Sequence, residues 1–236
     1  MTAYVRLVEL DVLRGWAVIL MIVFHLCYDL NYFGYVHIDI YQGTFWIYFR
    51  NLIVAIFLIS MGISLSLAHR PRIIWSKVKK RIFMLTGASL LVSVTTYFLF
   101  PSAWVYFGIL HFILFATLFG LFFLPYLRIS LIISIVIYIA YHMKYINMTW
   151  LWKIVDKYII NLPIYTVDLL ELHWFSFVLI GMSMASYGYH TKLLQNSFFQ
   201  SSFKYNKLLS YLGKHALLIY LIHQPIIFGF SMVLDT

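Results

Sequence analysis

Apolar segments long enough to cross a lipid bilayer follow one another along the whole chain. A spanning helix needs about 20 mainly apolar residues, and seven segments meet or approach that length. They lie near residues 12–32, 45–67, 82–100, 104–124, 128–144, 173–189 and 213–233. Because the lipid core offers no hydrogen bonds to the backbone, only helices and closed barrels cross it. The pattern predicts an all-α, polytopic membrane helix bundle with about seven transmembrane helices.

The composition agrees with this assignment and excludes an ordinary soluble domain. Hydrophobic residues make up 63 % of the chain and charged residues 11 %, whereas soluble domains are about 45–50 % apolar and about 25 % charged. No polar stretch is long enough to fold on its own, so we expect a single transmembrane domain over residues 1–236. The lone cysteine, Cys27, excludes an intramolecular disulfide.

The net charge of +9 reports topology rather than a nucleic-acid partner, because the basic residues fall in short loops between apolar segments. With seven spans, one side of the membrane receives Arg6, Arg70, Arg72, Lys77, Lys79, Lys80, Arg81, Arg128, Lys192, Lys204, Lys207 and Lys214. The other side receives only Lys144, Lys153 and Lys157. The positive-inside rule then predicts a cytoplasmic amino terminus and places residues 145–172 outside.

The first apolar segment carries four polar residues that share one helix face. Each residue of an α-helix turns the chain by about 100°, so Arg14 and His25 differ by about 20° in direction. Asp11 and Asp29 both lie about 60° from Arg14 on the same reckoning. A charge at the bilayer centre costs at least roughly 2.5–3.5 kcal/mol, so such residues face a bundle interior or a wet cavity. This stripe predicts an internal cavity.

Depth along the helix separates the roles of these residues. With a rise of 1.5 Å per residue, Arg14 lies near the cytoplasmic mouth and His25 about 16 Å further in. Asp29 follows one turn later, where we expect it to hydrogen-bond the imidazole of His25. The alternative is purely structural, with the stripe holding helices together through interhelical hydrogen bonds.

Other polar residues are candidates for the same cavity or for an acceptor. His111 and His223 fall within the fourth and seventh segments, where they either line the cavity or hydrogen-bond in the core. Asp168 and Glu171 lie beside His173 on the external segment, where they either bind a polar or ammonium group or are solvated. His25 and Asp29 have no evident further ligand partners, so we expect no metal site.

Several motifs in order resemble a known family of membrane enzymes. They are "LDVLRGWAVILMIVFH" followed by "YDL", then "FLISMGISLSLA", "YFGILHFI" and "LGKHALLIYLIHQPI". This series resembles the bacterial relatives of lysosomal heparan-alpha-glucosaminide N-acetyltransferase, and the arginine–histidine spacing is also similar to that of the type-three membrane acyltransferases. The resemblance implies transfer of an acetyl group from cytoplasmic acetyl-CoA to an amine or hydroxyl of an extracytoplasmic sugar or glycan. It also implies an integral protein of a bacterial or archaeal cytoplasmic membrane.

Within this resemblance, His25 is our candidate general base or transient acyl carrier, with Asp29 as its partner. Histidine suits proton transfer near neutrality because its ordinary pKa is about 6.5. The lysosomal relative has asparagine at the position matching His25, and its proposed histidine falls close to His37. His37 is therefore the alternative, although it reads as an exposed loop residue.

The coenzyme carries several phosphate charges, which arginine and lysine hold well. Our candidates for binding it are Arg14, Arg70, Arg72, Lys79 and Lys80, although the loop cluster is equally explained by topology alone. The main rival function is a proton-coupled small-molecule transporter that uses His25, Asp29 and Arg14 as a relay. A non-catalytic subunit is a second rival. We expect the lipid bilayer as a partner and no nucleic acid. A homodimer is the oligomeric state that we consider.

Overall fold

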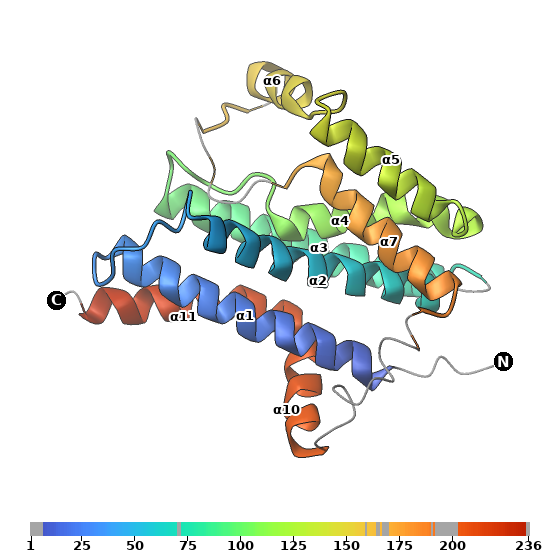
Figure 1. Cartoon of the computed structure of the whole chain (residues 1–236). Coiled ribbons are helices and arrows are strands. Elements are labelled where there is room, and N and C mark those ends of the chain that lie inside the picture. The colour runs from blue at the N-terminus through green and yellow to red at the C-terminus, as the bar shows by residue number, and fades with distance from the viewer. Residues whose placement is uncertain are drawn as a thin grey trace. The chain divides into compact units, whose positions relative to one another are not determined.

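The computed structural model describes residues 7–69, 72–158, 160–163, 166, 170–189, 191 and 203–234. Every regular element in these ranges is a helix (Figure 1). The elements are α1 (Val8–Tyr32), α2 (Thr44–Ala68), α3 (Trp75–Leu99), α4 (Ile109–Phe123), η1 (Leu124–Tyr126), α5 (Ser130–His142), α6 (Thr149–Tyr158), η2 (Leu172–Trp174), α7 (Phe175–Ser186), α10 (Phe203–Lys214) and α11 (Ala216–Leu234). The all-α prediction is confirmed for this part of the chain.

Five helices of the described chain are long and apolar enough to cross a membrane. They are Val8–Tyr32, Thr44–Ala68, Trp75–Leu99, Ile109–Tyr126 and Ala216–Val233. The other two predicted spans correspond to shorter apolar helices, Ser130–His142 and Leu172–Ser186. The 13 residues of α5 reach about 20 Å at 1.5 Å per residue, less than the hydrocarbon thickness of about 30 Å. The count of seven spans is therefore not confirmed.

Two predicted helix starts are wrong. The third helix begins at Trp75 instead of residue 82, so Lys77, Lys79 and Lys80 belong to its first turns instead of a loop. Long basic side chains at a helix end reach water while their stems stay in apolar surroundings, so charge does not stop the helix. The fourth helix begins at Ile109 instead of residue 104.

Side chains of α3 explain the late start of α4. The backbone N–H of Val105 donates to Thr96 Oγ1 at 3.0 Å, and Ser93 Oγ donates to the Val105 carbonyl at 2.7 Å. The connection before α4 thereby obtains its backbone hydrogen bonds from α3 rather than from helical neighbours. Apolar composition alone does not distinguish such a buried connection from a helix.

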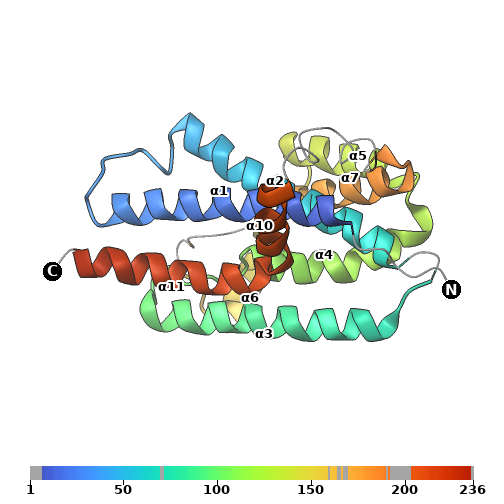
Figure 2. The same cartoon turned by 90° about the horizontal axis from the view of Figure 1, so that it is seen from below.

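The chain divides into two compact units, Met1–Ser60 with His190–Thr236, and Met61–Tyr189. In the first unit, α1 and α11 lie side by side, and α10 crosses α1 (Figures 1 and 2). Two glycines permit this crossing. A Cβ on Gly15 would collide with the backbone of Leu209, and a Cβ on Gly213 with the backbone of Asp11. The helices therefore touch backbone to backbone at the amino-terminal end of α1.

We expect Gly213→Val to destabilise the protein by at least about 1–3 kcal/mol, the usual cost of overpacking a tight site. The obstructing atoms belong to the backbone of Asp11, so no side-chain rotation relieves the collision. Thermal unfolding in detergent measures the effect. Gly87→Ala is the matched control, because no heavy atom lies within 4 Å of its added Cβ; an equal loss of stability in both variants would contradict this account.

In the second unit, α3 packs along α4, and α7 packs along α5 and α4. Gly62 of α2 lies against the backbone of Val178 in α7, where a larger residue has no room. Phe175 at the start of α7 contacts Phe115 and Phe123 of α4, with ring centroids 6.0 and 5.7 Å apart. Close small-residue contacts and aromatic packing stabilise helix pairs in a lipid environment.

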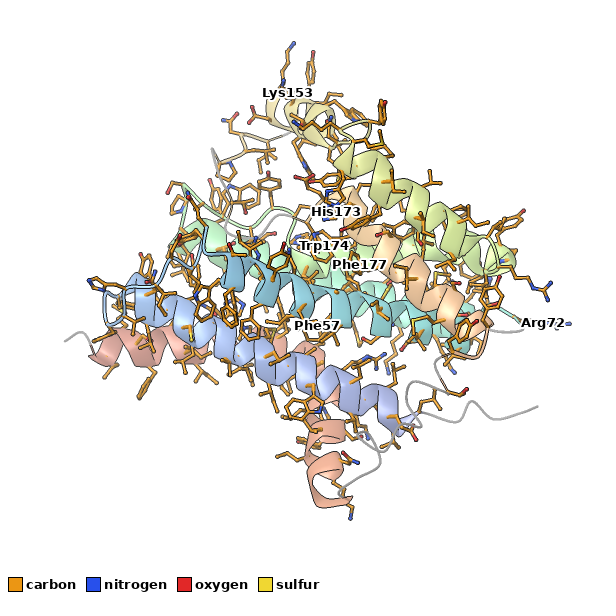
Figure 3. The ribbon with its side chains drawn as sticks, in the orientation of Figure 1. Phe57, Arg72, Lys153, His173, Trp174 and Phe177 are labelled. Atoms are coloured by element: carbon orange, nitrogen blue, oxygen red, sulfur yellow. The ribbon has the colours of Figure 1, made fainter. Side chains whose placement is uncertain are left out.

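The segment predicted to lie outside contains the short helix α6. Its Trp152 ring packs against Phe107 and Tyr106, with centroids 5.0 and 5.2 Å away. Thr166 Oγ1 donates to the Trp104 carbonyl at 3.0 Å. The segment thus rests on the connection before α4, while the exposed Lys153 projects away from it (Figure 3).

Candidate active site

Two histidines from helices distant in sequence meet in the first unit. The rings of His25 in α1 and His223 in α11 have centroids 4.8 Å apart and an interplanar angle of 65°. His223 is 6 % exposed. His25 Nδ1 and His223 Nε2 are both buried without a hydrogen-bond partner. Because buried polar atoms are nearly always paired, these two ring nitrogens, on rings in contact, are candidates for binding a substrate or a water molecule.

The tautomer of His223 follows from the hydrogen bond of its Nδ1. His223 Nδ1 lies 2.7 Å from the Tyr220 carbonyl oxygen, which only accepts hydrogen bonds. Nδ1 therefore carries the proton, and Nε2 of the neutral ring presents a lone pair. This unprotonated nitrogen is able to accept a proton or a hydrogen bond beside His25.

Asp29 has a different partner from the one predicted. Gln224 Nε2 donates to both carboxylate oxygens of Asp29, at 2.9 and 3.1 Å, and Asp29 is 0 % exposed. No hydrogen bond joins Asp29 to His25 in the described chain, so the expected pairing is wrong. The amide neighbouring His223 satisfies the carboxylate instead, which ties α1 to α11 beside the two imidazoles.

Apolar and aromatic side chains pack beside His25. Met21, Phe24, Ile40 and Ile53 form a buried cluster in the first unit. The Phe24 ring meets His25 edge-on, with centroids 5.6 Å apart.

Two tyrosine hydroxyls lie at the edge of this cluster. Tyr28, three residues after His25 on α1, has its hydroxyl 2.9 Å from that of Tyr41. The Tyr28 ring also lies edge-on to His25, with centroids 6.5 Å apart.

Arg14 is held by its own helix and by α2. Its guanidinium donates to Asp11 Oδ1 at 3.2 Å and to the Ser60 carbonyl at 3.3 Å. Asp11 is buried and Arg14 is partly exposed. The stripe therefore does not place Arg14 in contact with His25; the arginine forms a separate ion pair at the amino-terminal end of α1.

The predicted basic candidates of the second unit are solvent-facing. Arg72, Lys79 and Lys80 are exposed, and none has a hydrogen bond or ion pair with other described residues. Arg72 projects from the connection between α2 and α3 (Figure 3). Arg70 lies outside the described residues.

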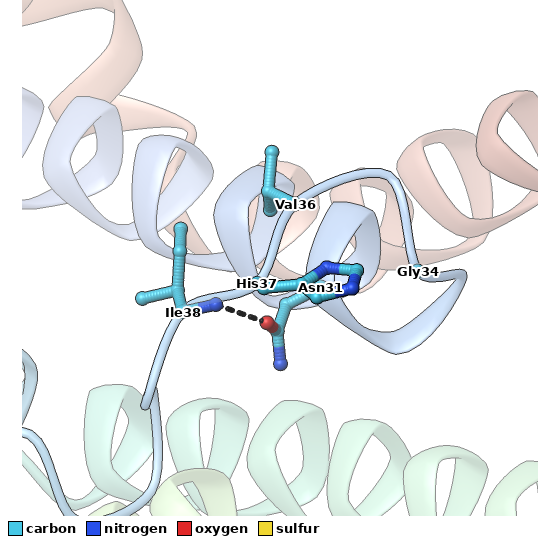
Figure 4. A pocket seen from close by; sticks show the side chains of 5 residues that line it. All are labelled: Asn31, Gly34, Val36, His37 and Ile38. Carbon is cyan, nitrogen blue, oxygen red and sulfur yellow. Dashed lines mark hydrogen bonds between the residues drawn. The ribbon is translucent and has the colours of Figure 1, made fainter.

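The remaining predicted residues do not join the histidine pair. His37 is exposed on the loop after α1 and lines a shallow depression with Asn31 and Ile38, where the Ile38 N–H donates to Asn31 Oδ1 at 2.7 Å (Figure 4). His111 belongs to the second unit, and its Nε2 lies 3.0 Å from Ser93 Oγ. Asp168 lies outside the described residues. Among described positions, no group of three or more metal-binding side chains is arranged to hold a metal ion.

Comparison with protein families assigns the chain. The family described as heparan-alpha-glucosaminide N-acetyltransferase, catalytic, matches residues 6–225. The chain belongs to this family. The match spans α1, which carries His25, and the part of α11 that carries His223 and Gln224. No curated protein and no solved structure matches the chain significantly.

Membership of the heparan-alpha-glucosaminide N-acetyltransferase family, together with the apolar helices, identifies an integral membrane protein of a membrane acetyltransferase family. Contacts of Gln224, Tyr28 and Tyr41 near the histidine pair were not predicted from the sequence. One available signal was the amide of Gln224 inside an apolar span, because a buried amide requires a partner. Nothing in the sequence alone indicated that Tyr28 and Tyr41 meet.

Proposed function

We propose that the protein transfers an acetyl group from cytoplasmic acetyl-CoA to an amine or hydroxyl of an extracytoplasmic sugar or glycan. The single observation that carries the proposal is the pair of buried, unpartnered ring nitrogens of His25 and His223 within the family's catalytic region. An acetyl transfer requires a base for the incoming nucleophile and an acid for the leaving thiolate. Two adjacent imidazoles supply both.

In the proposed reaction, the acceptor nitrogen or oxygen attacks the thioester carbonyl and loses its proton to His25. The carbon–sulfur bond breaks, and the thiolate takes a proton from the resulting imidazolium to leave as coenzyme A. His223 Nε2, with its lone pair directed by the Nδ1 hydrogen bond, holds the proton between these steps. An acyl-histidine intermediate is the alternative route, in which a ring nitrogen first takes the acetyl group.

The proposed setting is one transmembrane domain of seven spans, with α5 and α7 completing the set, in a bacterial or archaeal cytoplasmic membrane. The amino terminus faces the cytoplasm, where acetyl-CoA is available. Arg14, in its ion pair with Asp11, lies near that side. No metal takes part in the proposed chemistry.

Reconstitution tests the function directly. The purified protein in phosphatidylcholine vesicles receives radiolabelled acetyl-CoA on one side and glucosamine, as a model acceptor, on the other. We expect labelled N-acetylglucosamine that depends on both substrates. Proton movement across the vesicle membrane without any acetyl transfer would instead favour the transporter, and absence of acetyl-CoA binding would refute the proposal.

We expect residue 153 to be accessible from outside intact cells and residue 77 to be inaccessible. Both side chains are exposed, so the membrane decides which cysteine a membrane-impermeant maleimide labels. Lys77→Cys and Lys153→Cys are made in a Cys27→Ala background. Labelling at 77 but not at 153 would show that the orientation is reversed.

A further inference from the structure

Positive charge gathers at the α2–α3 connection without any nearby acidic sequence. No aspartate or glutamate occurs between Asp39 and Asp156. In the second unit, the described acidic residues are Asp156 in α6 and Glu171 before η2. Basic residues at the start of α3 therefore have no acidic neighbours along the chain.

The register of α3 divides these basic residues into two groups. Lys77 and Arg81 are four residues apart and so lie on one helix face, which the buried Val78 and Leu85 flank. Lys79 points about 160° away from Arg81 and is exposed. Arg81 is half-buried, whereas Lys77 and Lys79 are both exposed; Lys77 lies on the side of the helix that carries Arg81, and Lys79 lies on the opposite side.

His69 and Arg81 are both fixed in position. The Ile74 N–H donates to His69 Nδ1 at 3.2 Å, so Nε2 of the neutral ring carries the proton and is a donor. His69 is 6 % exposed, and its ring forms no second hydrogen bond with the described chain. Arg81 Nε donates to Thr117 Oγ1 of α4 at 3.3 Å, and Thr117 is 0 % exposed.

The His69 ring lies at the start of α3, because Ile74 contacts both His69, through its N–H, and Lys77, through its carbonyl. Burial lowers the pKa of His69, and the positive charges of Arg81 and Lys77 lower it further. The neutral imidazole thus offers an N–H donor beside two cations. Hydrogen-bond donors and cations gathered in this way suit an anion with several oxygens.

We propose that His69, Lys77 and Arg81 form a binding site for a phosphate group, which in this protein is a phosphate of coenzyme A. The assignment to the coenzyme rests on the function proposed above. It replaces Lys79 and Lys80 with residues on the side of the same helix that contacts α4 through Arg81. The guanidinium of Arg81, oriented by Thr117, pairs with phosphate oxygens, while His69 Nε2–H and Lys77 donate from the side.

The test is the affinity of the protein for coenzyme A, the reaction product, measured calorimetrically in phosphatidylcholine nanodiscs so that no turnover occurs. Hydrogen bonds to charged groups are strong enough that Lys77→Gln and Arg81→Gln should each weaken binding by roughly 10- to 100-fold. Lys79→Gln is the matched control, because it removes the same charge from an equally exposed position on the side of α3 opposite Arg81. We expect it to remain within about twofold of the wild type.

Three results would overturn the proposal. The first is equal weakening by Lys79→Gln and Lys77→Gln, which means diffuse attraction. The second is wild-type affinity in Lys77→Gln, a variant at an exposed position whose folding does not depend on the Thr117 contact. The third is binding of phosphatidic acid vesicles by the wild type but not by Lys77→Gln, with equal coenzyme binding in both proteins. That result would identify the ligand as a lipid headgroup.

Failure of the proposed function gives a different outcome. A wild type that binds no coenzyme A refutes the transferase, and inorganic pyrophosphate then probes the anion site itself. If pyrophosphate binds the wild type and Lys79→Gln but not Lys77→Gln, the anion site is supported without the coenzyme. If pyrophosphate does not bind the wild type, the anion site is overturned.

Discussion

Replacing His25 with alanine is expected to lower the rate of acetyl transfer by roughly 10²- to 10⁴-fold, the usual contribution of positioned proton transfer. The side chain forms no hydrogen bond with the described chain, so its removal costs only ring packing against Phe24, Tyr28 and His223. Its contact with His223 at 4.8 Å between ring centroids places it where a substrate would meet two bases. Initial rates in vesicles measure the loss, and binding of coenzyme A should persist because the cationic residues remain.

His37→Ala is the control that separates the two histidines suggested by the family resemblance. His37 is exposed on a loop, so its loss should leave folding unchanged and transfer near the wild-type rate. If His37→Ala abolishes transfer while His25→Ala keeps near wild-type rates, His25 is structural and our assignment is wrong.

The helices were predictable from the sequence because long apolar segments are recognisable from length and composition alone. Their ends were not, because side-chain hydrogen bonds decide them. The carbonyl and N–H of Val105 bind Ser93 and Thr96 of α3, and no apolar pattern reveals such contacts. The predicted start of α3 is too late because Lys77 and its basic neighbours are typical of loops between membrane spans. Long basic side chains at a helix end nevertheless reach water, so the helix includes them.

The site was predictable on one helix and not between helices. Helical spacing put Asp11, His25 and Asp29 on one face, and Asp11 and Asp29 are buried in the structure. Spacing within α1 suggested His25 as the partner of Asp29, because it is one turn away. The actual donor, Gln224, is 195 residues distant, and a contact of that kind depends on how α1 and α11 pack.

The same limit applies to the basic residues. Composition shows that Lys77, Lys79 and Arg81 lie together in the sequence, but only burial shows which face of α3 turns inward. The exposed Lys79 was a candidate for the coenzyme, whereas Arg81 contacts the buried Thr117. A helix predicted to begin at Trp75 would have placed Lys79 and Arg81 on different sides of α3.

The second large effect is expected at His223, where asparagine is the informative replacement. In the His223→Asn variant, the side-chain amide nitrogen occupies the place of Nδ1 and keeps a donor for the Tyr220 carbonyl, while Nε2 is lost. If Nε2 holds the proton during transfer, the rate should fall by roughly 10²- to 10⁴-fold with coenzyme affinity and unfolding temperature unchanged. A merely structural histidine would be rescued by the retained hydrogen bond.

Combining the two substitutions decides whether the imidazoles act as one unit. Residues that serve the same step have strongly non-additive effects on rate, so His25→Ala with His223→Asn should be little slower than the slower single variant. Rates are compared in the same vesicles, with the stability of each variant checked by thermal unfolding. Multiplicative losses would mean that the histidines act independently, and a wild-type rate in His223→Asn would remove Nε2 from the reaction, leaving His25 to work without a second base.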